Sequence, residues 1–353
     1  MPPTEQTVAE RTVAERRPAY QTELARGTDH FHERRRPDCP WCGSTGLGVR
    51  LRSTDLLQHK PGVFVLERCR ECGHCFQNPR LTPEGLEFYE RDAADRTARV
   101  FSARHGRRRH RAAARALLPF GEPESWLDVG TGDALFPAVA QGVHPYTSFD
   151  GLDPGPAVEE AVERGRIEEG HRGTLPALVP LLAGRYDVLS MFHHLERVLD
   201  PRAELLAAHA VLRPGGHLLI ETPEPDSRAA ALLGRWWPAH CRALHLIPLT
   251  NLRRELRRLG FTVVVTDTRA AHTPLDLSGA LILALDRWLP RPDTPWRTHP
   301  PTPLQRRTRR TLTRAATPLI SAAQATDHAL TPLTSRTSFT NTYRVIARKD
   351  GGG

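Results

Sequence analysis

Two pairs of cysteines near the start of the chain have the spacing of a metal site. Cys39 and Cys42 stand in "CPWCG", and Cys69 and Cys72 stand in "CRECG". Each CxxC turn directs two thiolates toward one point, so two such turns complete a tetrahedral site for Zn²⁺. Because four thiolates leave no open coordination position, the pattern predicts a structural zinc rather than a catalytic one.

The residues around these pairs leave two questions open. His74 and Cys75 follow the second pair and could replace one of its ligands. The stretches "GVRLRSTD" and "GVFVLERC" between the pairs predict two short strands, so residues 37–90 are expected to form a zinc ribbon with a linker helix. A redox dithiol is the alternative, but its usual strand–helix–strand context is missing here.

A turn rich in glycine marks the second region that could do chemistry. "SWLDVGTGDALFPAVA" predicts a strand over 126–129, a turn at Gly130 and Gly132, and the start of a helix. Asp153 ends the next predicted strand, where a carboxylate accepts hydrogen bonds from ribose hydroxyls. Leu135 stands where a dinucleotide motif has glycine, and no phosphate-binding GK[ST] follows. These features predict a ribose-containing ligand without pyrophosphate, such as S-adenosylmethionine; an ordinary strand–helix–strand turn is the alternative.

Later segments follow in the order of one known family. "RYDVLSMFHHLERVLDP" predicts a strand and a polar loop, "LRPGGHLLIETPEPD" a PGG turn and a strand, and "NTYRVIARK" a last strand. Together with the glycine turn, this series resembles the class I S-adenosylmethionine-dependent methyltransferases. It looks most like their ubiquinone-type branch, which carries a "D-V-G-x-G-x-G" motif, an "LEHV-x-DP" loop and an "L-x-PGG" turn. The resemblance covers roughly Trp126 to Phe261 plus the terminal strand, and it implies an α/β, Rossmann-like seven-stranded sheet whose last strand is antiparallel.

The resemblance also assigns residues to the cofactor S-adenosylmethionine. It implies contacts from Asp128, Gly130 and Gly132 to the methionine end, from Asp153 to the ribose, from Thr174 and Leu175 to the adenine, and from Phe192 and His193 to the flanks. Two residues depart from the family pattern. Ala134 replaces the third glycine, which we expect to weaken cofactor binding very little. Arg197 replaces the histidine of "LEHV", which puts a function on the substrate side in doubt.

Methyl transfer to a hydroxyl or an acidic carbon needs a base beside the acceptor. His193, His194 and Glu196 follow the fourth predicted strand and would face the methyl group. We favour His194 as the base, because a neutral imidazole titrates near working pH; a loop histidine bonded to the backbone is the alternative. Glu196 would orient the histidine or cap the helix that begins near Asp200. His245 lies in a stretch that the family often places over the acceptor pocket, so it is a further catalytic candidate.

The composition bounds the class of protein and its partners. The 353 residues, 39% of them hydrophobic, suffice for one large domain and a smaller module. The net charge of +9 comes almost entirely from arginine, in runs at 33–37, 104–111, 253–258 and 306–310. Such scattered runs favour solvated surfaces over one stripe that binds nucleic acid. The chain shows no secretory signal and no apolar segment near the length of a membrane span, so we expect a cytoplasmic protein without a transmembrane segment.

The pattern along the chain predicts five segments. They are a disordered tail (1–36), the zinc ribbon and linker helix (37–90), a methyltransferase core (91–269), a partly disordered insertion or lid (270–340), and the last core strand with a tail (341–353). The insertion would cover the substrate or mediate contacts in a homodimer. The segment "FQNPR" leaves the ribbon toward the core, which makes Phe76, Asn78 and Arg80 candidates for substrate contact.

The leading hypothesis is methyl transfer from S-adenosylmethionine to a small-molecule acceptor. The ribbon, of the form "CPxCG…CxxCG" followed by "NPR", looks like the N-terminal module of methyltransferases from glycan and natural-product pathways. The acceptor would then be a hydroxyl or acidic carbon of a sugar, a polyketide or a related intermediate. A zinc-ribbon RNA methyltransferase and a non-enzymatic scaffold that binds S-adenosylmethionine are the alternatives.

Overall fold

A twisted seven-stranded sheet forms the centre of the molecule in the computed structural model, which describes residues 8–92, 103–241 and 243–351. Its strands are β4 (Ser125–Val129), β5 (Ser148–Asp153), β6 (Gly170–Arg172), β7 (Tyr186–Phe192), β8 (Leu212–Pro223), β10 (Phe261–Asp267) and β11 (Thr342–Lys349). They lie in the order β10-β11-β8-β7-β4-β5-β6, and β11 runs antiparallel to both of its neighbours. The predicted fold class, with its antiparallel last strand, is therefore confirmed.

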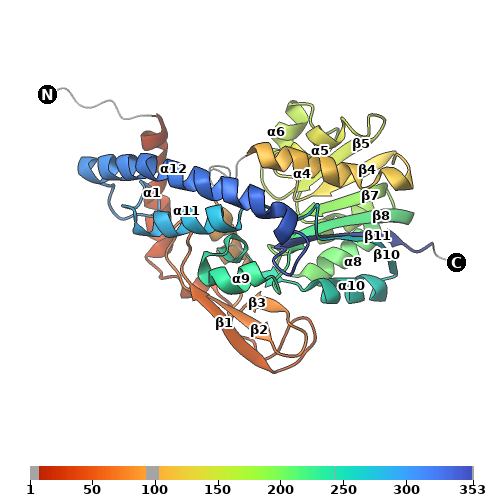
Figure 1. Cartoon of the computed structure of the whole chain (residues 1–353), viewed down its shortest axis with the longest axis horizontal. Coiled ribbons are helices and arrows are strands. Elements are labelled where there is room, and N and C mark those ends of the chain that lie inside the picture. Colours follow the sequence, from red (N-terminus) through yellow and green to blue (C-terminus); the bar gives the residue numbers. More distant parts are fainter. Residues whose placement is uncertain (1–7, 93–102, 242, 352–353) are drawn as a thin grey trace.

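Helices cover both faces of this sheet because alternate residues of each strand point to opposite sides. The helices are α4 (Ala103–Arg115), α5 (Leu135–Ala140), α6 (Ala157–Glu163), α7 (Leu175–Leu182), α8 (Pro201–Val211) and α10 (Leu249–Arg258). In β4, Trp126 packs with residues of α4, α5 and α6, whereas Leu127 packs with residues of α7, α8 and α10. Figure 1 shows α4, α5 and α6 along one face of the sheet, and α8 and α10 along the other.

A second, four-stranded sheet forms the ribbon module, and one of its strands comes from the core. β1 (Leu47–Ser53), β2 (Phe64–Cys69) and β3 (Cys75–Gln77) pair antiparallel, and β9 (His245–Leu246) adds to the edge of β3. The first two strands confirm the predicted ribbon hairpin. The two-residue β9 follows β8 in the chain, through α9 (Arg228–Leu233) and two short 3₁₀ turns, Gly234–Trp236 and Pro238–Cys241. The ribbon and the core are thus joined by backbone hydrogen bonds as well as by side-chain packing.

The N-terminal segment is ordered, which corrects the expected tail over 1–36. Helix α1 (Val8–Leu24) and a 3₁₀ turn (Asp29–Phe31) precede the ribbon, whereas residues 1–7 lie outside the described chain. Tyr20 is 2% exposed and lies 5.6 Å, ring to ring, from both Phe88 and Trp296. α1 has no clear apolar stripe, so its stability comes from these partners far along the chain, which sequence periodicity does not reveal.

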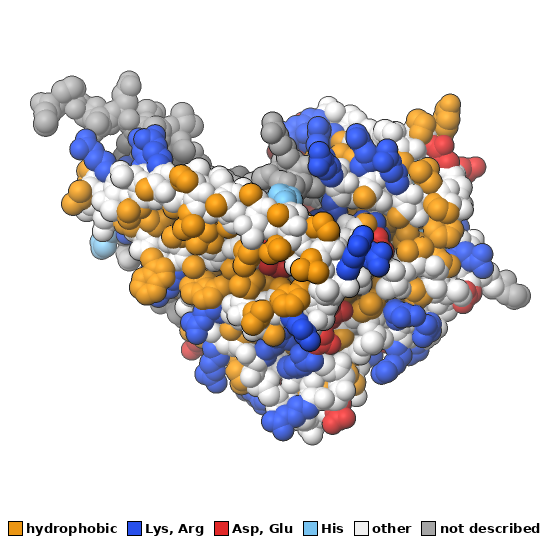
Figure 2. Space-filling model, viewed as in Figure 1, with side chains coloured by type: hydrophobic (Ala, Val, Ile, Leu, Met, Phe, Trp, Pro, Cys, Tyr) orange, Lys and Arg blue, Asp and Glu red, His pale blue; other side chains and the backbone are white. Residues whose placement is uncertain are grey.

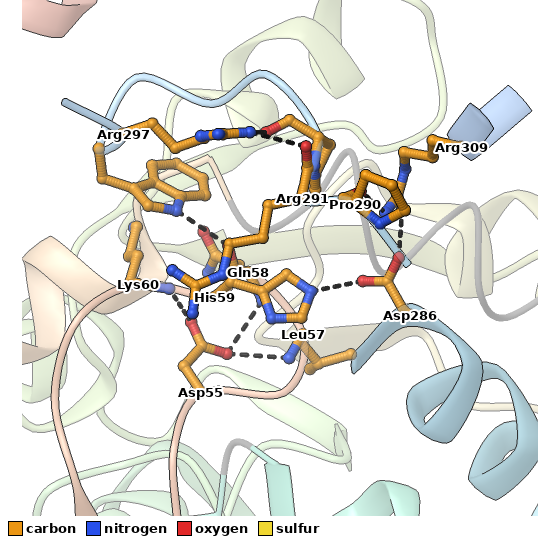
Figure 3. A network of polar contacts seen from close by, with 12 residues as sticks. Asp55, Leu57, Gln58, His59, Lys60, Asp286, Pro290, Arg291, Arg297 and Arg309 are labelled. Atoms are coloured by element: carbon orange, nitrogen blue, oxygen red, sulfur yellow. Dashed lines mark hydrogen bonds and ion pairs between the residues drawn. The ribbon is translucent and has the colours of Figure 1, made fainter. Parts of the chain in front are cut away.

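The insertion is also ordered, which corrects the expectation of a partly disordered lid over 270–340. It consists of α11 (Asp276–Trp288) and the long α12 (Pro303–Thr334), whose start is fixed by a capping box between Thr302 and Gln305. Figure 3 shows how α11 and the segment after it bind the ribbon loop: Asp286 accepts a hydrogen bond from His59 over 2.6 Å and also pairs with Arg309. Among the described residues, no helix has the length and apolar character needed to cross a membrane.

Candidate functional site

The four predicted metal ligands lie together at the tip of the ribbon. Within the described residues, the sulfur atoms of Cys39, Cys42, Cys69 and Cys72 all lie within 4.8 Å of one another. The Cys39 and Cys72 sulfurs are 3.7 Å apart, and those of Cys42 and Cys69 are 3.5 Å apart. Four thiolates at about 2.3 Å from one Zn²⁺ would have sulfur–sulfur distances of about 3.8 Å, so the cluster has the dimensions of a tetrahedral zinc site.

The two surplus candidates, His74 and Cys75, lie outside this cluster. His74 is fully buried, and its Nε2 lies 3.2 Å from Nδ1 of His245. Cys75 packs with Trp237 and Leu246, and Arg50 donates to its sulfur over 3.2 Å. Both residues therefore serve the packing between ribbon and core.

The glycine turn after β4 has the backbone conformation that requires glycine. Gly130 and Gly132 have φ of +73° and +56°, and a Cβ on Gly130 would lie 2.7 Å from Nδ1 of His194. The Gly132 amide donates to Oδ2 of Asp153 over 3.0 Å, and the Gly155 amide donates to Oδ1 over 2.8 Å. Two amides thus fix the carboxylate of Asp153 beside the turn, at the carboxyl end of β5.

Asp128 lies under the same turn in a buried position. Ser190 on β7 donates to its Oδ1 over 2.6 Å. Burial raises the pKa of Asp128 to about 7, although the hydrogen bond from Ser190 opposes the rise. A positive group that reaches this carboxyl would favour its ionised form.

Ala134 has a larger structural effect than expected from the sequence. It adopts φ +55° and ψ +39°, the left-handed conformation, and is fully buried at the start of α5. An alanine is strained in this conformation, whereas glycine is not. The cost of replacing the third glycine therefore comes from the backbone conformation of Ala134.

The loop after β7 pairs a histidine with a carboxylate. Nδ1 of His193 lies 3.0 Å from Oε1 of Glu196, and Thr222 donates to Oε2 of Glu196 over 2.9 Å. Burial favours a higher pKa for Glu196, but the contacts with His193 and Thr222 outweigh it and hold the pKa below its usual value. The ionised carboxylate accepts from Nδ1 of His193, so in the neutral ring the lone pair lies on Nε2, and this side chain is 31% exposed.

This geometry changes the order of the catalytic candidates. His194, which the sequence favoured, has 15% of its side chain exposed, and its Nε2 lies 3.3 Å from Glu204 on α8. Glu196 orients His193 instead of capping a helix, because Asp200 caps α8 by accepting from the Arg202 and Ala203 amides. Of the two histidines, His193 thus has the more exposed side chain and a buried carboxylate beside its ring.

His245 adjoins this loop through its backbone, because its amide donates to the Glu196 carbonyl over 3.1 Å, but its side chain lies in the seam between ribbon and core. It pairs with Phe76 in the ribbon sheet, is 4% exposed, and its Nε2 contacts the Leu199 carbonyl over 3.2 Å. Burial lowers the pKa of His245 to about 4, so it is neutral at physiological pH. The strand β9, which no local pattern predicts, moved this histidine into the seam between ribbon and core.

The remaining cofactor candidates differ in accessibility. Phe192 packs on Phe136 with ring centres 4.4 Å apart. Thr174 is exposed at the start of α7, whereas the side chain of Leu175 is fully buried in the core. Only the backbone of Leu175 can therefore reach a ligand.

The loop after β7 is connected to the ribbon by residues for which the sequence predicted no such role. Arg197 forms an ion pair with Glu90, the last residue of the linker helix α2 (Pro83–Glu90). Arg80 donates to the Leu199 carbonyl over 2.7 Å and pairs with Glu33, and Asn78 is bonded to Arg36. The substrate contacts expected from "FQNPR" are replaced by these internal bonds, which fasten the ribbon to the core.

Comparison with known proteins agrees with this arrangement. Residues 101–266 match the family model described as a methyltransferase domain. A ubiquinone biosynthesis O-methyltransferase of Marinobacter nauticus is 32% identical over 119 residues, which cover 31% of this chain and 48% of that protein. An uncharacterized 37.1 kDa protein in transposon TN4556 of Streptomyces fradiae is 30% identical over 175 residues, covering 42% and 49% of the two chains.

Among solved structures, a 1,6-didemethyltoxoflavin-N1-methyltransferase of Burkholderia thailandensis is 14% identical and has a TM-score of 0.45, covering 80% of this chain and 97% of that one. The chain spans about half the length of the curated relatives it matches. The matched family model, the order of the seven strands and the glycine turn beside Asp153 agree. Residues 101–266 therefore form a methyltransferase domain like those of the class I S-adenosylmethionine-dependent enzymes, and a ribbon with a four-cysteine cluster precedes it.

Proposed function

We propose that the chain transfers the methyl group of S-adenosylmethionine to a hydroxyl or an acidic carbon of a small molecule. The observation that carries this proposal is the pair formed by His193 and Glu196 at the carboxyl end of β7. It lies on the same edge of the sheet as the glycine turn and Asp153. A base and a ribose-binding carboxylate are the two functions that this reaction requires of the protein.

The residues present fit the cofactor. Asp153 would accept from the ribose hydroxyls, Gly130 and Gly132 would allow close approach of the backbone, and Asp128 would face the methionine end. Thr174 and the backbone of Leu175 would contact the adenine, and Phe192 would flank the bound cofactor. When bound, S-adenosylmethionine supplies an electrophilic methyl group. Nε2 of His193 would remove the proton from the acceptor atom, and the Glu196 carboxylate would stabilise the resulting imidazolium.

We propose a structural zinc ion at the four cysteines. The distances among the sulfur atoms support it, as does the burial of Cys39 and Cys69. The six cysteines are all unpaired, which also supports a reducing, cytoplasmic location.

A small molecule is a better acceptor for this surface than RNA. In Figure 2, arginine side chains lie in separate groups over the molecule, and no continuous basic stripe crosses the face that is drawn. Binding to a nucleic-acid backbone relies on such a stripe. The name of the Marinobacter relative, an O-methyltransferase, supports a hydroxyl as the acceptor group.

A homodimer remains part of the proposal. Hydrophobic side chains gather over α11 and α12 in Figure 2. The exposed apolar residues of these two helices include Trp288 on α11 (83% exposed) and Leu319 on α12 (56% exposed). An exposed apolar surface of this kind supports contact with a second copy of the chain.

Calorimetric titration with S-adenosylmethionine tests the proposed function. We expect Asp153→Ala to weaken binding at least about tenfold, because hydrogen bonds to a charged acceptor contribute about 1.5–3 kcal/mol. Asp133→Ala is the matched control, since Asp133 stands in the same turn but is exposed and pairs with Arg166. Equal affinities of the wild type and Asp153→Ala, or no binding by the wild type, would refute the assignment.

A further inference from the structure

A cavity of about 50 Å³ lies where the ribbon meets the core chain. One wall comes from ribbon strands β1, β2 and β3, a second from α2, and a third from residues 235–244 after β8. Most of the lining is apolar, with Leu51 and Phe64 from the ribbon, Leu86 from α2, and Ala243 and Leu244 from the core chain. The exposed Arg235 and the partly exposed Glu90 also line it, so the cavity reaches the surface at these residues.

Two of the residues that line this cavity each have a buried acceptor atom, and neither atom has a partner within the described part of the chain. Gln58 is 3% exposed; its Nε2 donates to the Tyr89 carbonyl over 2.6 Å, and its Oε1 is unpaired. His240 is 8% exposed; its Nδ1 lies 2.7 Å from the Gly234 carbonyl and must donate to it, so the unpaired Nε2 carries a lone pair. Both groups can therefore accept a hydrogen bond from a ligand.

Gln58 is held in place by a rigid loop. Figure 3 shows the carboxylate of Asp55 between the amides of Leu57, Gln58 and Lys60, which donate to it over 2.9–3.2 Å. The Gln58 carbonyl in turn accepts from the indole of Trp296 over 2.9 Å. A buried acceptor without a partner costs about 1–3 kcal/mol. Because the loop is fixed, the side-chain oxygen of Gln58 cannot reach water. The loop thus presents an acceptor that a ligand with a donor would satisfy.

The cavity and the proposed catalytic loop share their supports. Glu90 lines the cavity and pairs with Arg197, which follows Glu196 directly. The amide of Leu244, another lining residue, donates to the Glu196 carbonyl over 2.7 Å. A molecule that fills the cavity therefore contacts the elements that position His193.

We propose that this cavity binds one ring of the methyl acceptor, and that the ring is apolar and carries at least one anchoring hydroxyl. The hydroxyl would donate to Nε2 of His240, Oε1 of Gln58 would accept from a second donor of a larger ligand, and the ring would lie against the leucines. The cavity opens to the surface at Glu90 and Arg235, so the rest of the acceptor would extend past these two residues. This inference rests on the proposed function, because it names the class of acceptor for that reaction.

Titration of the full-length protein with phenol and with toluene, followed by NMR, tests the inference. The two probes have nearly the same shape, and only phenol has a donor. We expect phenol to bind the wild type about tenfold more tightly than toluene, the value of one buried hydrogen bond. In His240→Phe this preference should disappear while the toluene affinity stays within about twofold.

His144→Phe is the matched control, because His144 is also fully buried, also has one unpaired ring nitrogen, and lies away from the cavity against Ala114. It should keep the phenol preference. Ala243→Leu should fill the cavity and abolish binding of both probes. Equal affinities for the two probes, no binding of either, or a preference that persists in His240→Phe would overturn the inference.

A second measurement separates the acceptor role from mere binding. With S-adenosylmethionine present, we expect nuclear Overhauser contacts between phenol and the S-methyl group. Their absence would overturn the acceptor role of the cavity. Because binding of S-adenosylmethionine is measured separately by calorimetry, failure of the cavity and failure of the proposed function give different results.

Discussion

The ribbon and the central sheet are held together by different means. The central sheet buries apolar residues on both faces, so strands such as β4 and β7 are stabilised by packing along most of their length. The ribbon has little interior of its own: Trp41 and Phe76 pack into the same cluster as the core strands, and β1 is half exposed. The ribbon thus depends on its thiolates and on later parts of the chain, whereas the core sheet depends on the hydrophobic effect.

The same contrast separates two histidine pairs. His193 pairs with Glu196 beside the glycine turn and keeps 31% of its side chain exposed, so its free nitrogen can meet a ligand. His74 and His245 stack on one another in the buried seam, and burial lowers the pKa of both. Residue type alone does not decide which histidine does chemistry; burial and the second partner of the ring do.

Removal of a metal ligand should have the largest effect, and the effect should be confined to the ribbon. We expect Cys42→Ser to lose zinc and to unfold the ribbon, because a structural zinc site contributes about 10–16 kcal/mol at neutral pH. Hydrogen exchange should show lost protection in β1 and β2 and retained protection in β4 and β5. Cys75→Ser is the control and should retain zinc, since Cys75 lies outside the cluster. One bound zinc in Cys42→Ser would contradict the four-thiolate assignment.

In the core, the contribution of a buried ion pair to the stability of the protein can be tested in the same way. Arg344 on β11 donates to Glu221 on β8 over 2.7 Å, and both side chains are almost fully buried. We expect Arg344→Met to destabilise the protein by about 3–5 kcal/mol, because Glu221 keeps a buried charge without its main partner. Urea denaturation measures the change. Arg348→Met on the exposed part of the same strand should change stability by less than about 0.5 kcal/mol; a similar loss in both variants would argue against the buried pair.

The pH dependence of cofactor binding sharpens the description of the core site. Because the pKa of Asp128 is raised to about 7, its carboxyl must lose a proton below that pH before it can stabilise a positive charge at the methionine end. We expect the affinity for S-adenosylmethionine to fall by up to about tenfold per unit as the pH drops below 7. Calorimetry between pH 5.5 and 8 measures this, and Asp128→Asn should give a flat profile. A flat profile in the wild type would exclude this role of Asp128.

The smallest expected effect is at the start of α5. Ala134→Gly should stabilise the protein by about 1 kcal/mol, because glycine adopts the left-handed conformation of this position without strain. Ala138→Gly, inside the same helix, should instead destabilise it by about 1 kcal/mol. Chemical denaturation distinguishes the two signs. Equal destabilisation by both substitutions would show that the backbone of Ala134 is not strained.

Features encoded over short distances could be predicted from the sequence. The four cysteines, the glycine turn, the order of the core strands and the position of Asp153 all depend on spacing within one turn, one strand or one strand–helix unit. The structure brings the four sulfurs together and holds Asp153 beside Gly132. Such local patterns survive in the fold because backbone geometry links neighbouring residues directly.

Errors arose where the partner of a residue lies far along the chain. The N-terminal helix is held by the contact of Tyr20 with Trp296. The insertion is held by two contacts with the ribbon loop: His59 contacts Asp286, and the Gln58 carbonyl accepts a hydrogen bond from Trp296, 238 positions later. The local stretch around His245 predicts a place on the acceptor side, whereas the two-residue strand β9 places its side chain against His74, 171 positions earlier.

The sequence by itself determined the class of the core fold, the ribbon strands and the clustering of the four cysteines, because these depend on residue types at fixed short spacings. Only the tertiary structure decided that the side chain of His193 is more exposed than that of His194, that Glu90 supports Arg197, and that Gln58 and His240 line one cavity. Those choices depend on which side chains become buried together. Burial is a property of packing across the whole chain, and local periodicity contains little information about it.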